Sequence, residues 1–197
     1  MIITVASFKG GVAKTTSAIH LAAYLQKKGP TLLIDGDPNR SASGWAKRGN
    51  LPFKVIDERQ AARFARDFAH VIIDTEARPS EEDLKALADG CDLLIIPTTP
   101  DALSLDALLL TVDAIKSVGA DRYKVLLTII PPRPSHDGDD ARQTITGVGL
   151  PLFKNSIPRL VAFQKAALAG VPVYEVGDPR AEDAWASYQG VGKEVLA

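Results

Sequence analysis

The stretch FKGGVAKTT, residues 8–16, is the part of the sequence that decides the fold. It follows the β-branched run IITVAS (2–7), which predicts a buried strand, and it leads into residues 14–28, whose apolar positions have helical spacing. Gly10 and Gly11 let the backbone approach a polyphosphate, and the free amides of a helix N-terminus attract its charge. A glycine-rich turn with no ligand is the alternative, but strand, loop and helix in this order favour a phosphate-binding loop.

The side chains of the loop support the same interpretation. Lys14 is placed to neutralise the β- and γ-phosphates, the Thr15 hydroxyl is available to Mg²⁺, and Thr16 can donate to the α-phosphate. The first 34 residues contain no Asp or Glu that would repel an anion. Ala13 stands where the usual loop has glycine, and we expect this alanine to cost roughly 1 kcal/mol only if its φ is positive.

The loop departs from the usual GxxxxGKS/T pattern because Phe8 occupies the first glycine position and Lys9 adds an early lysine. The stretch KGGVAKTT (9–16) resembles the deviant Walker A motif of the ParA/MinD superfamily of ATPases. The resemblance implies that ATP is bound by Lys9, Gly10, Gly11, Val12, Ala13, Lys14, Thr15 and Thr16. It also implies an ATP-dependent sandwich homodimer in which Lys9 crosses to the partner's phosphates and, with Lys14, takes part in catalysis.

A first acidic motif follows the next predicted strand, in LLIDGDPNRSA (32–42). Asp35 and Asp37 stand just past the strand end, which is where ligands bind in parallel sheets, although Asp-Gly-Asp-Pro also suits a plain turn. The motif resembles the D-x-D-P motif of the same superfamily. By that resemblance Asp35 helps to hold hydrated Mg²⁺, together with Thr15, and Asp37 orients the attacking water as a catalytic residue.

A second acidic motif, HVIIDTEARP (70–79), resembles Walker B, which implies that Asp74 binds Mg²⁺, usually through water. Glu76 lies two residues further on and is a second candidate base if the strand continues, because alternate strand residues share a face. Residues 77–83 are then expected to form a segment that senses the γ-phosphate. For Asp101 and Ser104, after the strand at 92–97, helix capping is the preferred interpretation.

The remaining pattern predicts one α/β domain over residues 1–197, with a P-loop NTPase fold and a mostly parallel twisted sheet covered by helices on both faces. Further strands are predicted at 31–34, 70–74, 92–97 and 123–130. Further helices are predicted at 57–68, 80–89, 104–119, 158–170 and 179–197. Residues 131–140 are the most loop-like, and either a functional or a plain solvated loop fits them.

Composition limits the classes of function. The net charge is −1, so a nucleic-acid surface must be a local patch, and Cys91 alone cannot form a disulfide or the paired cluster ligands of a nitrogenase-type iron protein. No apolar run reaches the length that spans a bilayer, and no secretory signal precedes residue 10, so a cytoplasmic location is expected. The three histidines lie far apart and predict no metal site.

The expected function rests on the resemblance. The resemblance to the ParA type implies an ATP-bound dimer that binds nucleoid DNA non-specifically, and an adaptor protein on a plasmid or carboxysome cargo that stimulates hydrolysis. Lys154, Arg159 and Lys165 form an acid-free stretch that predicts DNA contact, with Arg133 and Arg180 as further cations; a solvated helix face is the alternative. The first predicted strand begins at Ile2, which is typical of the small ParA type, and LLIDGDPNRSA and IPTTPDALSLDALL (96–109) resemble McdA-type members that distribute carboxysomes.

Two other classes are weighed against this one. A MinD-like positioning ATPase holds membrane through a basic amphipathic C-terminal helix, but AWASYQGVGKEVLA (184–197) has one lysine and two glycines and is a poor anchor. A small P-loop ligase of the dethiobiotin synthetase type has a similar size and fold but lacks the early lysine of the loop. A nucleotide-dependent scaffold is a third possibility, and DNA-dependent turnover separates these classes.

Overall fold

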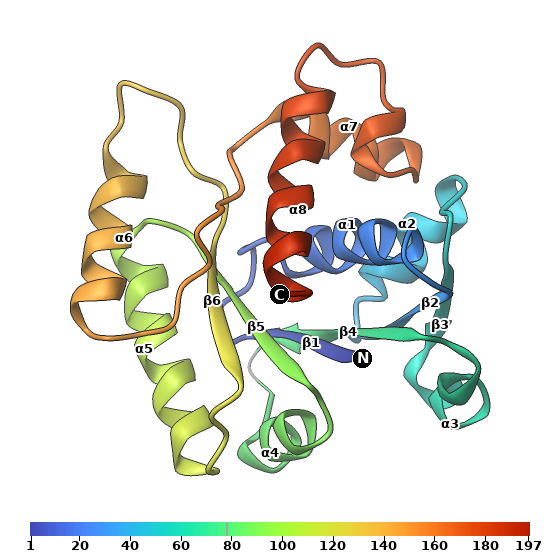
Figure 1. Ribbon diagram of the computed structural model, residues 1–197, viewed down its shortest axis with the longest axis horizontal. Helices are drawn as coiled ribbons and strands as arrows, with labels where there is room; N and C mark the ends of the chain where they lie inside the picture. The colour runs from blue at the N-terminus through green and yellow to red at the C-terminus, as the bar shows by residue number, and fades with distance from the viewer. Residues whose placement is uncertain (78) are drawn as a thin grey trace.

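The computed structural model describes residues 1–77 and 79–197 of the chain, and its centre is a single six-stranded sheet (Figure 1). The strands lie in the order β3-β2-β4-β1-β5-β6, and every pair of neighbours is parallel. Their bounds are β1 Ile2–Ser7, β2 Thr31–Gly36, β3 Lys54–Asp57, β4 His70–Ala77, β5 Leu93–Thr98 and β6 Tyr123–Leu127. The predicted α/β fold with a parallel sheet is confirmed.

Helices cover both faces of the sheet, as Figure 1 shows. Helices α1, α2, α7 and α8 lie on one face, and α4, α5 and α6 lie on the other. The helices are α1 Lys14–Gln26, α2 Ser41–Arg48, α3 Ala61–Phe64, α4 Glu81–Asp89, α5 Ala102–Ser117, α6 Asp137–Gly147, α7 Val161–Ala169 and α8 Ala181–Val195. Three short 3₁₀ segments are η1 Glu58–Gln60, η2 Ala65–Asp67 and η3 Val173–Glu175.

Helix α1 is the structural base of the phosphate loop, because it is buried on nearly every side between the sheet and α8. Ile19, Leu21 and Leu25 are fully buried, and each aliphatic side chain of this kind stabilises the fold by about 1.5–3 kcal/mol. Gly192 lets α8 approach closely, since a Cβ there would lie 2.3 Å from the ring of Tyr24. The loop therefore projects from one of the most rigidly packed elements of the molecule.

Three elements, β3, α2 and α6, were absent from the sequence-based expectation. The edge strand β3 was not predicted, because its four residues are too few to show an alternating pattern. Helix α2 was missed as well: its own sequence contains glycine and serine, and it is held by burial of Ala42 and Trp45 and by a cap from β2. Helix α6 begins at Asp137, inside the stretch 131–140 expected to be a loop.

The predicted helix over 57–68 is wrong as a continuous element. The structure divides this stretch into η1, α3 and η2. Neither η1 nor α3 has a fully buried residue, and of the described side chains in this stretch only the partly buried Ala61, Phe64 and Phe68 pack against the sheet, which is too small an apolar face to hold a longer helix. This looser arrangement leaves room beside β2 and β4, which matters for the cavity described below.

Candidate nucleotide-binding site

The phosphate loop has two left-handed residues, Gly11 with φ of 78° and Ala13 with φ of 63°. Loops of this kind turn their amides inward and form a concavity for anions. Ala13 is also the residue before α1, and its carbonyl accepts the first helical bond from the Ser17 amide at 2.9 Å. The alanine therefore adopts the conformation in which a Cβ is strained, at a cost of about 1–2 kcal/mol.

A cavity of about 460 Å³ lies over this loop and unites most of the predicted site. Its lining consists of Gly10, Gly11, Ala13, Lys14, Thr15, Thr16, Asp37, Asn39, Ser41, Ala77 and Ile129. Val12, predicted to bind the nucleotide, does not line it: its side chain is 2% exposed in the core, and its carbonyl accepts from the Thr128 hydroxyl at 3.1 Å. Val12 thus fixes the loop to β6 and leaves its neighbours to face the cavity.

Lys14 and Asp74 form the charged floor of the site. Burial lowers the pKa of Lys14, while the nearby carboxylates of Asp74 and Asp37 oppose that shift. Burial raises the pKa of Asp74 to about 7, and the nearby Asp35 adds to this rise. The Thr15 hydroxyl and the Lys14 ammonium act in the opposite direction. The two groups are held apart from bulk water in the position where the strand ends and the loop meet.

The arrangement fits a magnesium ion held through water. Both oxygens of Asp74 are buried and neither makes a hydrogen bond of normal geometry with the described residues, so this carboxylate is free to accept from water on a cation. Among residues 1–77 and 79–197, no three His, Cys, Asp or Glu side chains converge to hold a metal directly. Mg²⁺ keeps several waters in proteins and needs no such direct cluster, so Thr15, Asp35 and Asp74 stay its predicted ligands.

Asp35 and Asp37 have different surroundings although one residue separates them. Asp35 is fully buried, with one oxygen accepting from the Ser43 amide of α2 at 2.8 Å and the other from the Asp37 amide at 3.3 Å. Asp37 lines the cavity, and its Oδ1 accepts two bonds from Asn39, at 2.8 Å and 3.0 Å. Asp35 therefore shapes the turn, and Asp37 is presented to the ligand.

The sheet register explains why the acidic motifs meet. Asp35 of β2 lies directly beside Asp74 of β4, and in parallel strands such neighbours share a face. Between Val5 and Ser7 of β1, however, β4 contains one extra residue. This bulge turns Ala77 to the phosphate cavity and leaves Glu76 lining a cavity on the opposite face. The hypothesis that Glu76 is a second base beside Asp74 is therefore wrong.

A second cavity, of about 370 Å³, adjoins the first and shares Ala13, Thr16 and Ile129 with it. It is lined further by residues 157–160 and by Phe163, Gln164 and Ala167 of α7. Sequence reasoning missed this cavity, because its walls come from an irregular segment with no motif. Ile129 has a positive φ of 53°, which is a genuine outlier for a β-branched residue and marks the junction of the two cavities.

His20 supports this junction from below. Its Nε2 accepts from the Val173 amide at 3.1 Å, so the proton is on Nδ1, which donates to the carbonyl of Thr16 at 2.7 Å. Burial lowers the pKa of His20 to about 4, and the ring stays neutral in this tautomer. The ring also meets Phe163 edge-on, so one side chain positions both a loop residue and a wall of the second cavity.

Lys9 does not line the phosphate cavity. Its Nζ lies 2.9 Å from Asp101 Oδ1 and 2.6 Å from Ser104 Oγ, at the first turn of α5. Asp101 also caps α5 by accepting from the Ser104 amide at 3.0 Å, so the expected capping role is confirmed. Partial burial acts to raise the pKa of Asp101, but bonds from Lys9, Ser104 and Thr99 outweigh it and hold that pKa well below its usual range.

The sequence profile of the CobQ/CobB/MinD/ParA nucleotide-binding domain matches residues 3–173. The chain belongs to this family. The family includes the ParA/MinD proteins, so the resemblance noted in the loop is confirmed for the family and the fold, and the roles of the individual site residues stay predictions.

Relatives of the chain include carboxysome-distribution and ParA proteins. The maintenance of carboxysome distribution protein A of Gloeobacter kilaueensis is 34% identical over 201 residues, covering 98% of this chain and 93% of that protein. The protein ParA of Rhizobium radiobacter is 31% identical over 172 residues, covering 79% and 74%. The structure of a Cyanothece McdA variant in complex with ATP has the same fold, with a TM-score of 0.74 at 20% identity and coverage of 99% and 95%.

The cations predicted for DNA contact are spread over the surface of this ParA/MinD family member. Lys154 is exposed near the end of α8, where its amide donates to Glu194 at 2.9 Å. Lys165 of α7 forms an ion pair with Asp178 at 2.7 Å. Arg159 lines the second cavity, beside the phosphate loop. Contact with DNA at these residues stays a prediction. For Arg159, a ligand in the second cavity is an alternative to DNA.

In the part of the chain that is described, no helix is both long and apolar enough to cross a bilayer.

Proposed function

We propose that the protein is a ParA-type ATPase that dimerises around ATP and positions a cargo through hydrolysis stimulated by a partner. The observation that carries the proposal is one cavity of phosphate size lined by Lys14, Thr15 and Asp37, with the buried Asp74 carboxylate near Lys14 and with Lys9 held outside the cavity. A chain that bound its nucleotide only in cis would have no evident use for this second lysine.

The nucleotide is expected to occupy both cavities. The loop amides and Lys14 neutralise the phosphates, and Thr16 donates to the innermost of them. The second cavity takes the nucleoside, with Ile129 and Phe163 as apolar walls and Arg159 as a cation that stacks on the base. Bound Mg²⁺ would supply charge neutralisation between the terminal phosphates, held by Thr15 and, through water, by Asp35 and Asp74.

Asp37 is suited to orient the attacking water. It is only half buried, it faces the phosphate cavity, and Asn39 fixes its carboxylate by two bonds to Oδ1. A carboxylate held in this way accepts a hydrogen bond from water without a search through rotamers. Lys14 would bind the phosphates from the side of the loop. The lysine would thus neutralise the phosphates while Asp37 orients the attacking water.

Dimerisation requires Lys9 to leave its site on α5. In a sandwich dimer the ammonium would exchange Asp101 and Ser104 for the phosphates of the partner subunit, where a cation stabilises the charge that develops during transfer. The exchange replaces an ion pair that is largely open to solvent, with side chains 32% and 52% exposed, and such pairs contribute at most about 1 kcal/mol.

The cellular role that we propose follows the relatives. The dimer binds nucleoid DNA non-specifically through exposed cations, including Lys154, Arg133 and, where its pair with Asp178 opens, Lys165. An adaptor on the cargo stimulates hydrolysis and releases the protein from the nucleoid. The 34% identity with the Gloeobacter protein, over 98% of this chain, favours a carboxysome as cargo. The similarity to ParA makes a plasmid the alternative cargo.

The test measures mass and DNA binding with each nucleotide. Light scattering after gel filtration is expected to show a dimer with ATP and Mg²⁺ and a monomer with ADP, and only the dimer is expected to retard a duplex of arbitrary sequence. Asp37→Ala is expected to accumulate the ATP dimer, because hydrolysis is slowed while binding is kept. A monomer with ATP and normal turnover in Asp37→Ala would contradict the proposal, and equal DNA binding with ADP would contradict its cellular part.

A further inference from the structure

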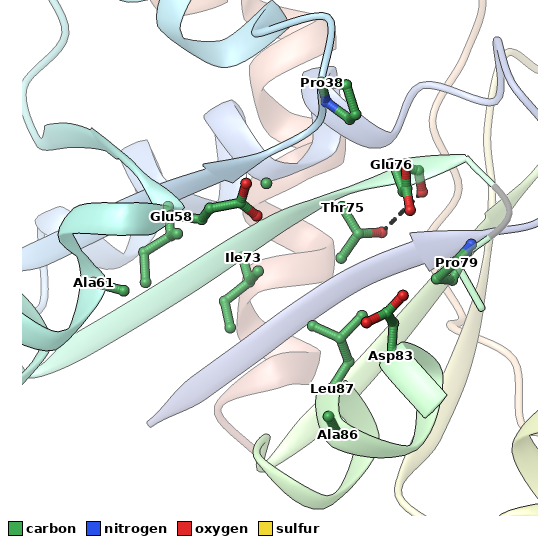
Figure 2. Close-up of a pocket in the computed structure, with 12 residues that line it drawn as sticks. Pro38, Glu58, Ala61, Ile73, Thr75, Glu76, Pro79, Asp83, Ala86 and Leu87 are labelled. Carbon is green, nitrogen blue, oxygen red and sulfur yellow. Dashed lines mark hydrogen bonds between the residues drawn. The ribbon is translucent and has the colours of Figure 1, made fainter. Parts of the chain in front are cut away.

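A cavity of about 470 Å³ lies on the face of the sheet opposite the phosphate site (Figure 2). Figure 2 shows Ile73 and Thr75 of β4 between Glu58 and Ala61 on one side and Asp83, Ala86 and Leu87 of α4 on the other. The cavity exists because residues 58–67 form only short helical turns, which leave part of β2 and β4 uncovered. Its size suits a few side chains of a ligand.

The floor of this cavity is apolar and unfilled. Ile34 and Ile73 contribute from the two strands, Ala61 from α3, and Ala86 and Leu87 from α4. Ile73 and Leu87 remain partly exposed, unlike the neighbouring Ile72 and Leu84, which are fully buried in the two main cores. Aliphatic side chains that line a cavity of this size gain from an apolar ligand that displaces water.

The rim is acidic. Glu58, Glu76 and Asp83 line the cavity, and no lysine or arginine is among its described lining residues. Glu58 pairs with Arg40 at 3.3 Å and Asp83 accepts from the Ser80 hydroxyl at 2.5 Å, but no described group pairs with the half-buried carboxylate of Glu76. A carboxylate beside apolar side chains is stabilised most by a cation that arrives with the ligand.

We propose that this cavity binds a segment of a partner protein in which an aliphatic side chain is flanked by Lys or Arg. The aliphatic group would fill the space over Ile73 and Leu87, and a cation would pair with Glu76. The three carboxylates exclude nucleic acid, nucleotides and anionic lipid surfaces as occupants, since like charges would be brought together. A purely apolar ligand would cover Glu76 and leave it without a partner among residues 1–77 and 79–197.

The position of the cavity gives such a segment access to the nucleotide site, a step that rests on the proposed function. Asp35 and Asp74 are buried on the face of the sheet that carries the phosphate loop, while Ile34 and Ile73, the residues before them, line the cavity on the other face. Pro38, directly after Asp37, also lines it. An occupant would therefore contact the immediate neighbours of Asp35, Asp37 and Asp74. Any displacement of this cavity wall would also displace the ends of β2 and β4.

The binding step is tested without nucleotide. The probe is a fluorescein-labelled peptide, Gly-Arg-Leu-Leu-Arg-Gly, followed by anisotropy at low salt, and the comparison peptides replace both arginines with glutamate or both leucines with serine. Only the Arg-Leu peptide is expected to bind. Glu76→Gln is expected to weaken it about 5- to 10-fold, and Ala86→Trp, which fills the cavity from an exposed position of α4, to abolish binding. Glu82→Gln, on α4 but outside the cavity lining, is the matched control and is expected to bind as the unaltered protein does.

The outcomes separate this inference from the proposed function. Equal binding to Glu76→Gln and Ala86→Trp, equal binding of the Leu-to-Ser peptide, displacement of the peptide by spermine at similar concentration, or no binding at millimolar peptide each overturns it. ATP binding and dimerisation are measured in the same samples with a labelled ATP analogue. If the unaltered protein shows neither ATP binding nor dimerisation, the proposed function is contradicted, and peptide binding stands as an independent result.

Discussion

Lys9 and Lys14 stand five residues apart in one loop, yet the structure gives them opposite surroundings. Lys14 is 7% exposed and lies over Asp74 in the phosphate cavity, whereas Lys9 lies outside that cavity and is held by Asp101 and Ser104 at the start of α5. Lys14 is thus fixed in place by the fold, and Lys9 is held by a partly exposed ion pair that can be exchanged. The difference teaches that the fold itself fixes Lys14 at the predicted phosphate site, whereas the proposed role of Lys9 in a dimer requires its contact with Asp101 to be broken.

The largest effect is expected for Lys14→Ala. Removal of the buried ammonium eliminates the bonds to the phosphates and leaves Asp74 without its opposing charge, so ATP affinity should fall at least about 100-fold. Isothermal titration with ATP and Mg²⁺ measures this directly. Lys28→Ala, which removes an exposed lysine at the other end of α1, is the matched control; ATP affinity of Lys14→Ala within a few-fold of the control would refute the assignment.

Lys9→Ala should affect dimerisation and leave nucleotide binding intact. Because Lys9 is outside its own cavity, ATP affinity of the monomer is expected to change less than about 3-fold, while the ATP-dependent dimer is lost. Gel filtration with light scattering measures the second effect and titration the first. Lys9→Arg keeps the charge and tests whether charge alone suffices; a Lys9→Ala dimer of normal affinity would show that this lysine does not act across an interface.

Asp101→Asn should shift the same equilibrium in the opposite direction. Asparagine keeps the cap of α5 but removes the charge that holds Lys9, so less ATP should be needed for dimerisation, by about 2- to 5-fold. The midpoint is read from mass against ATP concentration. Asp106→Asn, on an exposed position of the same helix, is the control, and a midpoint equal to that of the control would mean that the Lys9 contact does not oppose the dimer.

Ala13→Gly is expected to give the smallest change. Glycine adopts the positive φ of this position without strain, so the free energy of unfolding should rise by about 1 kcal/mol, measured by urea titration. The contrasting control is Ala186→Gly, at an exposed position within α8, which should lower that free energy by about 1 kcal/mol. If both variants lose stability, the alanine at position 13 is not strained by its positive φ.

Much of the site was predictable because its residues are close in sequence and follow predicted strands. The glycines, Lys14, Thr15 and Thr16 lie within one loop, and parallel strands bring their carboxyl ends together, which places Asp35, Asp37 and Asp74 at the same edge. Glu76 could not be predicted, since the bulge that turns it away depends on the pairing of β4 with β1. The walls of the second cavity could not be predicted either, because residues 158–160 were expected to be helical, whereas α7 begins only at Val161 and residues 157–160 form an irregular wall.

The sequence by itself determined the type of fold, the phosphate loop and the presence of a second lysine, because these depend on local order and periodic burial. The tertiary structure alone decided where that lysine rests, since Asp101 is 92 residues away and is brought near only when α5 packs beside β1. It also decided the φ of Ala13, which the sequence left open, and the cavity opposite the site. These features depend on contacts between distant segments, whose geometry no local pattern specifies.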